Sequence, residues 1–219
     1  ITDIATGNPS AGIGPWAGAL GSGTKLYQQA VADLGDGRYI VGGSEHDFQF
    51  WDRNRTQLLE SKITKQGGDT QAIEVLGGKV YFACHCGNWV YEGTNNWASP
   101  TGFRTIEPIN LVAAVDPTTM EYDTSWYPAS LKGVQDEGVW TIDQDSRGCL
   151  WVGGDLTQGA TSGVAANDWL GGFGRFCPTD STVPTTPTGL TATPAGSGLT
   201  VSWNPATDVF EFPGNMNSF

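Results

Sequence analysis

The chain has 219 residues and a formal net charge of −12 at pH 7, with 31 glycines, 12 prolines and nine tryptophans. So many turn-forming residues favour short strands over long helices, and the aromatic side chains can supply a large hydrophobic core. The acidic balance, without a basic cluster, argues against a nucleic-acid partner, and no run of about 20 apolar residues predicts insertion into a membrane. We therefore expect an all-β protein.

A short motif occurs three times without gaps, at residues 37–43, 78–84 and 148–154. In each copy a turn glycine begins an apolar strand that ends in two small residues; another strand precedes the turn and an aromatic strand follows. A fourth type of strand recurs at residues 111–120, and four strands per unit are typical of a β-propeller blade. The sequence predicts a β-propeller-like array of about three four-stranded antiparallel blades within residues 1–178.

The spacing of the copies leaves the completeness of this array open. The second copy lies farther from the third than from the first, which indicates an insertion near residues 94–110. Three blades are fewer than the four to eight of typical propellers. Upstream blades, self-association with a partner chain or the N-terminal segment would have to complete the sheet. Chance recurrence in a glycine-rich all-β chain is the alternative to a true repeat.

The composition changes after Cys177 to a polar stretch rich in proline and threonine, which is typical of linkers between extracellular modules. We therefore place a linker at residues 179–187, between a repeat domain of residues 1–178 and a short C-terminal β segment of residues 188–219. That segment contains the alternating sequence Leu-Thr-Val-Ser-Trp at residues 199–203.

Two parts of the chain resemble known families. The sequences Gly-Arg-Tyr-Ile-Val-Gly-Gly at residues 37–43 and Ala-Ala-Val-Asp-Pro-Thr-Thr at residues 113–119 resemble the bacterial delta-60-type repeat. This resemblance implies a propeller-like domain of a secreted or envelope protein, usually without catalysis. Residues 187–208 resemble the beginning of a fibronectin type III module, with Trp203 as its core tryptophan. Such a sandwich needs about 100 residues, so we expect a partial module.

Four cysteines in an acidic, tryptophan-rich chain suit an oxidising compartment, so we expect a secreted or cell-surface protein. If residues 150–156 and 170–176 pair as one antiparallel hairpin, Cys149 comes to lie directly opposite Cys177. The spacing therefore predicts a cross-strand disulfide between these two cysteines. Cys84 and Cys86 then remain, either as a local disulfide or as free thiols.

Two short motifs imitate metal sites. Cys84, His85 and Cys86 carry the usual zinc ligands, but alternate residues of a strand point to opposite faces, so at most two of the three converge. Residues 143–148 imitate the start of a calcium loop, but Arg147 occupies the fifth position, where an oxygen ligand is expected. We expect no metal and no cofactor.

Two tryptophans have neighbours that suit sugar binding. Trp97 lies beside Asn95, and Trp169 beside Asp168. A flat apolar ring can stack on a sugar while short polar groups bond its hydroxyls. Burial within the sheets is the alternative role of both rings.

Carboxylates supply a second candidate site. Glu45 and Asp47 follow the first repeat copy, and Asp155 follows the third, so they could meet at a sheet edge. Solvated loop charges are the alternative, and no residue is predicted to be catalytic. We expect an extracellular noncatalytic binding or adhesion module, with a polysaccharide or another cell-surface component as partner. An accessory part of a secreted polysaccharide-degrading enzyme, and a structural spacer, are the alternatives.

Overall fold

The computed structural model describes residues 28–54, 56–94, 101–133, 138–159, 168–178 and 183–207, apart from the side chains of residues 45 and 65–67. These residues form fourteen β-strands and one short 3-10 helix, η1 (Ser44–His46). In this part of the chain no helix is long and apolar enough to cross a membrane. The all-β prediction is confirmed.

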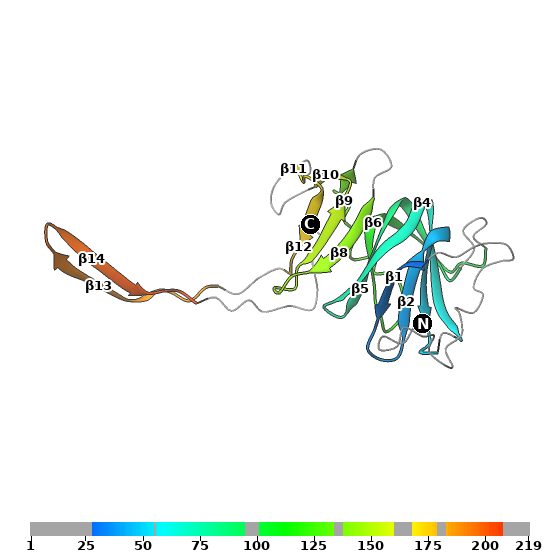
Figure 1. Cartoon of the computed structure of the whole chain (residues 1–219), viewed down its shortest axis with the longest axis horizontal. Coiled ribbons are helices and arrows are strands. Elements are labelled where there is room, and N and C mark those ends of the chain that lie inside the picture. Colours follow the sequence, from blue (N-terminus) through cyan, green and yellow to red (C-terminus); the bar gives the residue numbers. More distant parts are fainter. Residues whose placement is uncertain are drawn as a thin grey trace, which may run out of the picture.

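The first six strands form one antiparallel sheet in chain order. They are β1 (Gln28–Asp33), β2 (Tyr39–Gly43), β3 (Asp47–Trp51), β4 (Leu58–Leu76), β5 (Lys79–Glu92) and β6 (Ile106–Val115). The long β4–β5 ladder shifts register three times between residues 65 and 72. Such irregularities bend a ladder and increase its twist. The sheet curls into a nearly closed, barrel-like layer (Figure 1).

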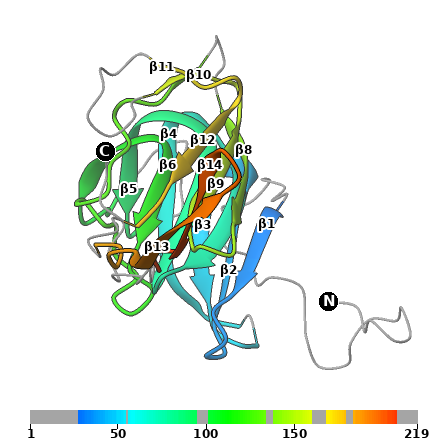
Figure 2. The same cartoon turned by 90° about the vertical axis from the view of Figure 1, so that its left-hand side faces the viewer.

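The following strands make two smaller sheets. The strands β12 (Phe173–Phe176), β9 (Leu150–Gly154) and β8 (Val139–Gln144) form one of them. The short strands β11 (Asp168–Trp169), β10 (Leu156–Gly159) and β7 (Lys132–Gly133) form the other. Figure 2 looks onto the β12–β9–β8 sheet, with the six-stranded sheet behind it.

Two hydrophobic clusters lie on opposite faces of β5 and β6. Along β5, Phe82 and Cys84 point into the curled sheet, whereas Tyr81 and Ala83 point toward the β12–β9–β8 sheet. Period-2 alternation therefore joins the two layers through the same strands. Because both faces of β5 and β6 are buried, their sequences read as nearly continuous apolar runs.

The strands are not grouped as the repeats predict. Two copies of the motif, residues 37–43 and 78–84, lie in the same six-stranded sheet, and the third lies in the β12–β9–β8 sheet. The four-stranded blade prediction therefore does not match the sheets that the structure describes. The motif marks a tight turn and the strand after it, and the hydrogen-bonded ladder continues across β3 and β4 without the break that separate blades require.

The C-terminal strands β13 (Thr188–Ala195) and β14 (Gly198–Asn204) pair as a hairpin that projects away from the sheets (Figure 1). Every residue of the hairpin is exposed. Trp203, the predicted core tryptophan, is 58% exposed. The linker prediction falls partly on residues 179–182, which lie outside the described residues.

Candidate functional site

The outer surface of the β12–β9–β8 sheet presents aromatic side chains to solvent. In β9, Leu150 and Val152 are fully buried, and Trp151 between them points outward and is 40% exposed. In β12, Phe176 is buried, whereas Phe173 is 61% exposed. Strand alternation produces this surface, because inward apolar residues leave their neighbours facing water.

The register places polar groups on both sides of Trp151. Asp143 of β8 and Arg175 of β12 lie directly opposite it in the two ladders. Two residues further along β9, Gly153 lies between Thr141 and Phe173. We call the residues Thr141, Asp143, Trp151, Phe173 and Arg175 the aromatic face.

Asp145 holds the Trp151 ring in place. The indole Nε1 donates a hydrogen bond to Asp145 Oδ2 at 3.1 Å, and Arg175 Nη2 donates to the same oxygen at 2.9 Å. The guanidinium carbon lies 5.2 Å from the Trp151 ring centroid, within the range of cation–π attraction. A tryptophan held in this way loses little side-chain entropy when a ligand stacks on it.

The remaining oxygen of Asp145 is also occupied. It accepts backbone hydrogen bonds from Arg147 at 2.9 Å and from Cys149 at 3.0 Å. The hydrogen bond from Trp151, with those of the backbone and Arg175, lowers the pKa of Asp145 to about 2. Asp145 is therefore a permanent anion at neutral pH, and its role is to hold Trp151 and Arg175.

A disulfide links the two neighbouring strands β9 and β12 of the aromatic face. It joins Cys149, directly before β9, to Cys177, directly after β12. The β9–β12 register pairs Leu150 with Phe176 and Trp151 with Arg175, as the predicted hairpin requires. The prediction of this cysteine pair is confirmed. Arg175 Nη2 also lies 3.0 Å from Cys149 Sγ, so the disulfide packs against the face.

Asp155 bonds to a different tryptophan. Trp140 lies at a register shift of β8, and its Nε1 donates to Asp155 Oδ2 at 2.9 Å. Its ring centroid lies 5.5 Å from that of His85 of β5. Asp155, one of the candidate carboxylates, therefore holds the indole of Trp140 in place.

Asp47 is buried at the beginning of β3. Gln28 Nε2 donates to its Oδ2 at 3.2 Å, whereas its Oδ1 has no hydrogen-bond partner. Burial raises the pKa of Asp47 to about 7. Asp47 and Asp155 therefore lie in different surroundings with different partners, and the side chain of Glu45 lies outside the described residues. The structure gives no support to a shared carboxylate site.

Of the predicted loop tryptophans, Trp169 belongs to β11 and is 76% exposed, so the alternative that it is a core residue is wrong. Asp168 precedes it in the same strand and is half-buried. Trp97 and Asn95 lie outside the described residues. Trp169 is available for stacking, and its role as a ligand contact stays a prediction.

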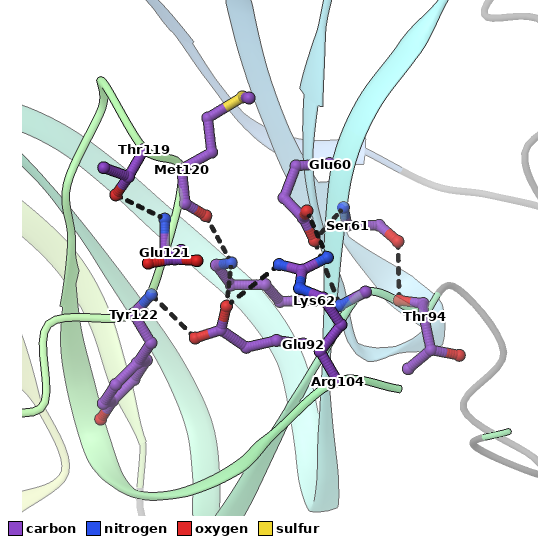
Figure 3. Close-up of polar contacts among 11 residues, drawn as sticks. Glu60, Ser61, Lys62, Glu92, Thr94, Arg104, Thr119, Met120, Glu121 and Tyr122 are labelled. Carbon is purple, nitrogen blue, oxygen red and sulfur yellow. Dashed lines mark hydrogen bonds and ion pairs between the residues drawn. The ribbon is translucent and has the colours of Figure 1, made fainter. Parts of the chain in front are cut away.

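The structure also contains a buried ion pair (Figure 3). Lys62 of β4 lies opposite Glu92 of β5, and its Nζ donates to Glu92 Oε2 at 3.0 Å and to the carbonyl of Met120 at 2.6 Å. Burial lowers the pKa of Lys62, and the charge of Glu92 opposes that effect. Because Lys62 is inaccessible to solvent, we assign this pair to the support of the fold.

The two motifs that imitate zinc and calcium sites have other structural roles. Cys84 and Cys86 pair as a local disulfide inside the core, and His85 points to the other face. Residues 145–148 form the turn between β8 and β9. Within the described ranges, no three His, Cys, Asp or Glu side chains gather as metal ligands.

Sequence reasoning missed Trp151, Arg175 and Asp145, although signals for the first two were present. Trp151 interrupts an apolar run at an outward position, and the predicted hairpin register already places Arg175 opposite it. Comparison of the chain with protein-family models and with curated proteins gave no match.

Proposed function

We propose that the protein is an extracellular, noncatalytic binding or adhesion module, and that the aromatic face binds a glycan. One observation carries the proposal: Trp151 is exposed, is fixed by Asp145, and lies between a carboxylate and a guanidinium. An indole offers a flat apolar surface to the C–H groups of a sugar ring. Asp143 can accept hydrogen bonds from hydroxyl groups, and Arg175 can donate to them.

The chemistry of the face supports binding rather than catalysis. A general acid must carry a proton near the working pH. Asp145, with a pKa of about 2 and four hydrogen-bond donors around it, cannot do so. Asp47 has a pKa in the useful range, but its side chain is buried. Turnover of a polysaccharide that Asp47→Asn abolishes would establish the alternative, an accessory part of a polysaccharide-degrading enzyme, and lack of any ligand would favour a structural spacer.

The cellular location belongs to the same proposal. Two disulfides fit an oxidising, extracellular environment. The delta-60-type and fibronectin type III resemblances, and self-association to complete the sheet, remain parts of the proposal. Exposed Trp169, beside Asp168, is a second ligand contact that we propose from sequence and exposure.

The test is a binding screen of the full chain against immobilised polysaccharides, followed by titration of the best ligand. We expect Trp151→Ala to weaken binding about tenfold or more, which corresponds to ~1.4 kcal/mol. Trp203→Ala is the matched control, because Trp203 is equally an exposed strand tryptophan but belongs to the C-terminal hairpin. Equal affinity of the two folded variants would contradict the proposed site. Trp169→Ala, measured beside them, tests the second contact.

A further inference from the structure

We infer that the aromatic face selects neutral glycans, whose sugars carry hydroxyl groups but neither carboxylate nor sulfate, and discriminates against acidic glycans. This inference rests on the proposed function and deepens it by naming the ligand class. Recognition of an acidic polymer would require unpaired positive charge beside the stacking ring. The aromatic face instead combines a paired cation with a carboxylate, Asp143, that accepts the backbone N–H of Gln144 at 2.8 Å but has no ion pair among the described residues.

Arg175 is the one cation of the aromatic face, and its charge is already matched. Its Nη2 lies 2.9 Å from Asp145 Oδ2, and its guanidinium lies over Trp151. The group can still donate hydrogen bonds, because a guanidinium carries five N–H donors and its side chain remains 37% exposed. It can therefore bond a hydroxyl oxygen, but it leaves little net positive charge for an anion.

The opposite side of Trp151 is negative. Asp143 is exposed and faces the ring from β8. Glu74 of β4 lies close by, since Gln144 Nε2 donates to Glu74 Oε1 at 2.8 Å. The pKa of Glu74 is raised, first by burial and then by the charge of Asp143, so the two carboxylates repel each other. A carboxylate or sulfate on a ligand would meet the same repulsion.

A neutral sugar would be attracted by Asp143 and not repelled by it. Its hydroxyl group can donate a hydrogen bond to Asp143, which a ligand carboxylate cannot do at neutral pH. The interaction with an ionised acceptor is among the stronger hydrogen bonds. The net charge of −12 adds a long-range repulsion against polyanions. That part of the selectivity falls with ionic strength, because the Debye length shortens from ~30 Å at 0.01 M salt to ~8 Å at 0.15 M.

The experiment compares polymers that differ only in charge. Soluble glucan, mannan and galactan are each titrated beside a portion of the same polymer oxidised at C6 to the uronic acid. We expect at least one neutral polymer to bind the full chain about tenfold tighter than its oxidised form at low salt, with a smaller ratio at high salt.

Two charge variants separate local from global effects. Asp143→Asn should reduce the ratio between neutral and oxidised polymer, because it removes the carboxylate beside Trp151. Glu121→Gln is the matched control: it removes the same charge from an exposed position after β6, which is not part of the aromatic face. It should leave the ratio nearly unchanged.

The outcomes are distinguishable. Equal or tighter binding of the oxidised polymer, still dependent on Trp151, overturns the inference and leaves the proposed function intact. Equal reduction of the ratio by Asp143→Asn and Glu121→Gln overturns the role of Asp143. Failure of every polymer, neutral and oxidised, to bind overturns the proposed function together with this inference.

Discussion

At the scale of single residues, the same amino acid has opposite roles at two positions. Asp145 is held as an anion by Trp151, Arg175 and two backbone amides, and its pKa falls to about 2. Asp47 is buried with one oxygen unbonded, and its pKa rises to about 7. Environment decides which carboxylate fixes the side chains of the aromatic face and which one makes stability depend on pH.

The pKa of Asp47 gives a pH-dependent stability with a definite sign. The folded protein retains the Asp47 proton up to a pH of about 7, whereas the unfolded chain releases it near the ordinary aspartate pKa of 3.8. The contribution of Asp47 to the free energy of unfolding is therefore full below pH ~4 and is lost as pH rises through the folded pKa. An asparagine side chain at this position would mimic the protonated carboxyl at every pH.

We therefore expect Asp47→Asn to unfold at a higher temperature than wild type at pH 8, and at a similar temperature at pH 4. The gain at pH 8 should be a few kcal/mol at most, at ~1.4 kcal/mol for each unit of pKa difference. Thermal unfolding of both proteins from pH 4 to 8 measures it. A stability difference that does not grow with pH would show that Asp47 titrates normally.

At the scale of elements, the Lys62–Glu92 pair joins two strands and the segment that follows β6. It joins β4 to β5, and Glu92 Oε1 accepts the backbone N–H of Tyr122, after β6, at 2.8 Å (Figure 3). Arg104 adds a partly exposed ion pair with Glu60 at 2.8 Å, and its other terminal nitrogen lies 3.5 Å from Glu92 Oε2. The exposed pair contributes little, whereas loss of one partner of a buried pair leaves an uncompensated charge.

Lys62→Met should lower the free energy of unfolding by up to about 3–5 kcal/mol, because Glu92 would remain buried with only the more distant and partly exposed Arg104 as its cation, at 3.5 Å. The double variant Lys62→Met with Glu92→Gln should recover part of this loss. Denaturant unfolding of the two variants measures both effects. If the double variant is no more stable than Lys62→Met alone, lost packing, and not the charge of Glu92, causes the loss of stability.

The Cys149–Cys177 disulfide stabilises the elements of the aromatic face. It joins two cysteines that are 28 positions apart in the sequence, and the loop that it closes contains β9 and β12. The double variant Cys149→Ser with Cys177→Ser should lose about 2–4 kcal/mol of stability. Thermal unfolding measures this loss, and peptide mapping without reduction should recover the two cysteines in one linked pair. A Cys84–Cys177 or Cys86–Cys149 link would contradict the structure.

The sequence predicts local features well because they depend on neighbouring residues. The alternation of Leu150, Trp151 and Val152, and the register that pairs Cys149 with Cys177, follow from the period of a strand and from hairpin geometry. The exposure of Trp169 was harder to predict, because a tryptophan beside polar residues is also compatible with burial.

At the scale of the whole molecule, sequence reasoning reached the all-β class but not the grouping of the strands. Whether β3 and β4 separate or continue one ladder depends on hydrogen bonds between hairpins and on the irregularities between residues 65 and 72. A turn motif carries no information on either. Asp145 was missed for a similar reason, since it reaches Trp151 through the shape of a turn and not through strand spacing.

The disulfide also determines how the molecule would bear tension. Force that enters from the C-terminal segment reaches Cys177 and passes through the covalent bond to Cys149, so residues 150–176 are excluded from the load path. Trp151 and Arg175 both lie within this shielded segment. We expect stretching of single oxidised molecules to leave Trp151 of β9 and Arg175 of β12 paired, whereas β8, with Thr141 and Asp143, lies outside the disulfide loop and bears the load. A reducing agent would open the loop, and β12 would then be peeled from β9 at lower force.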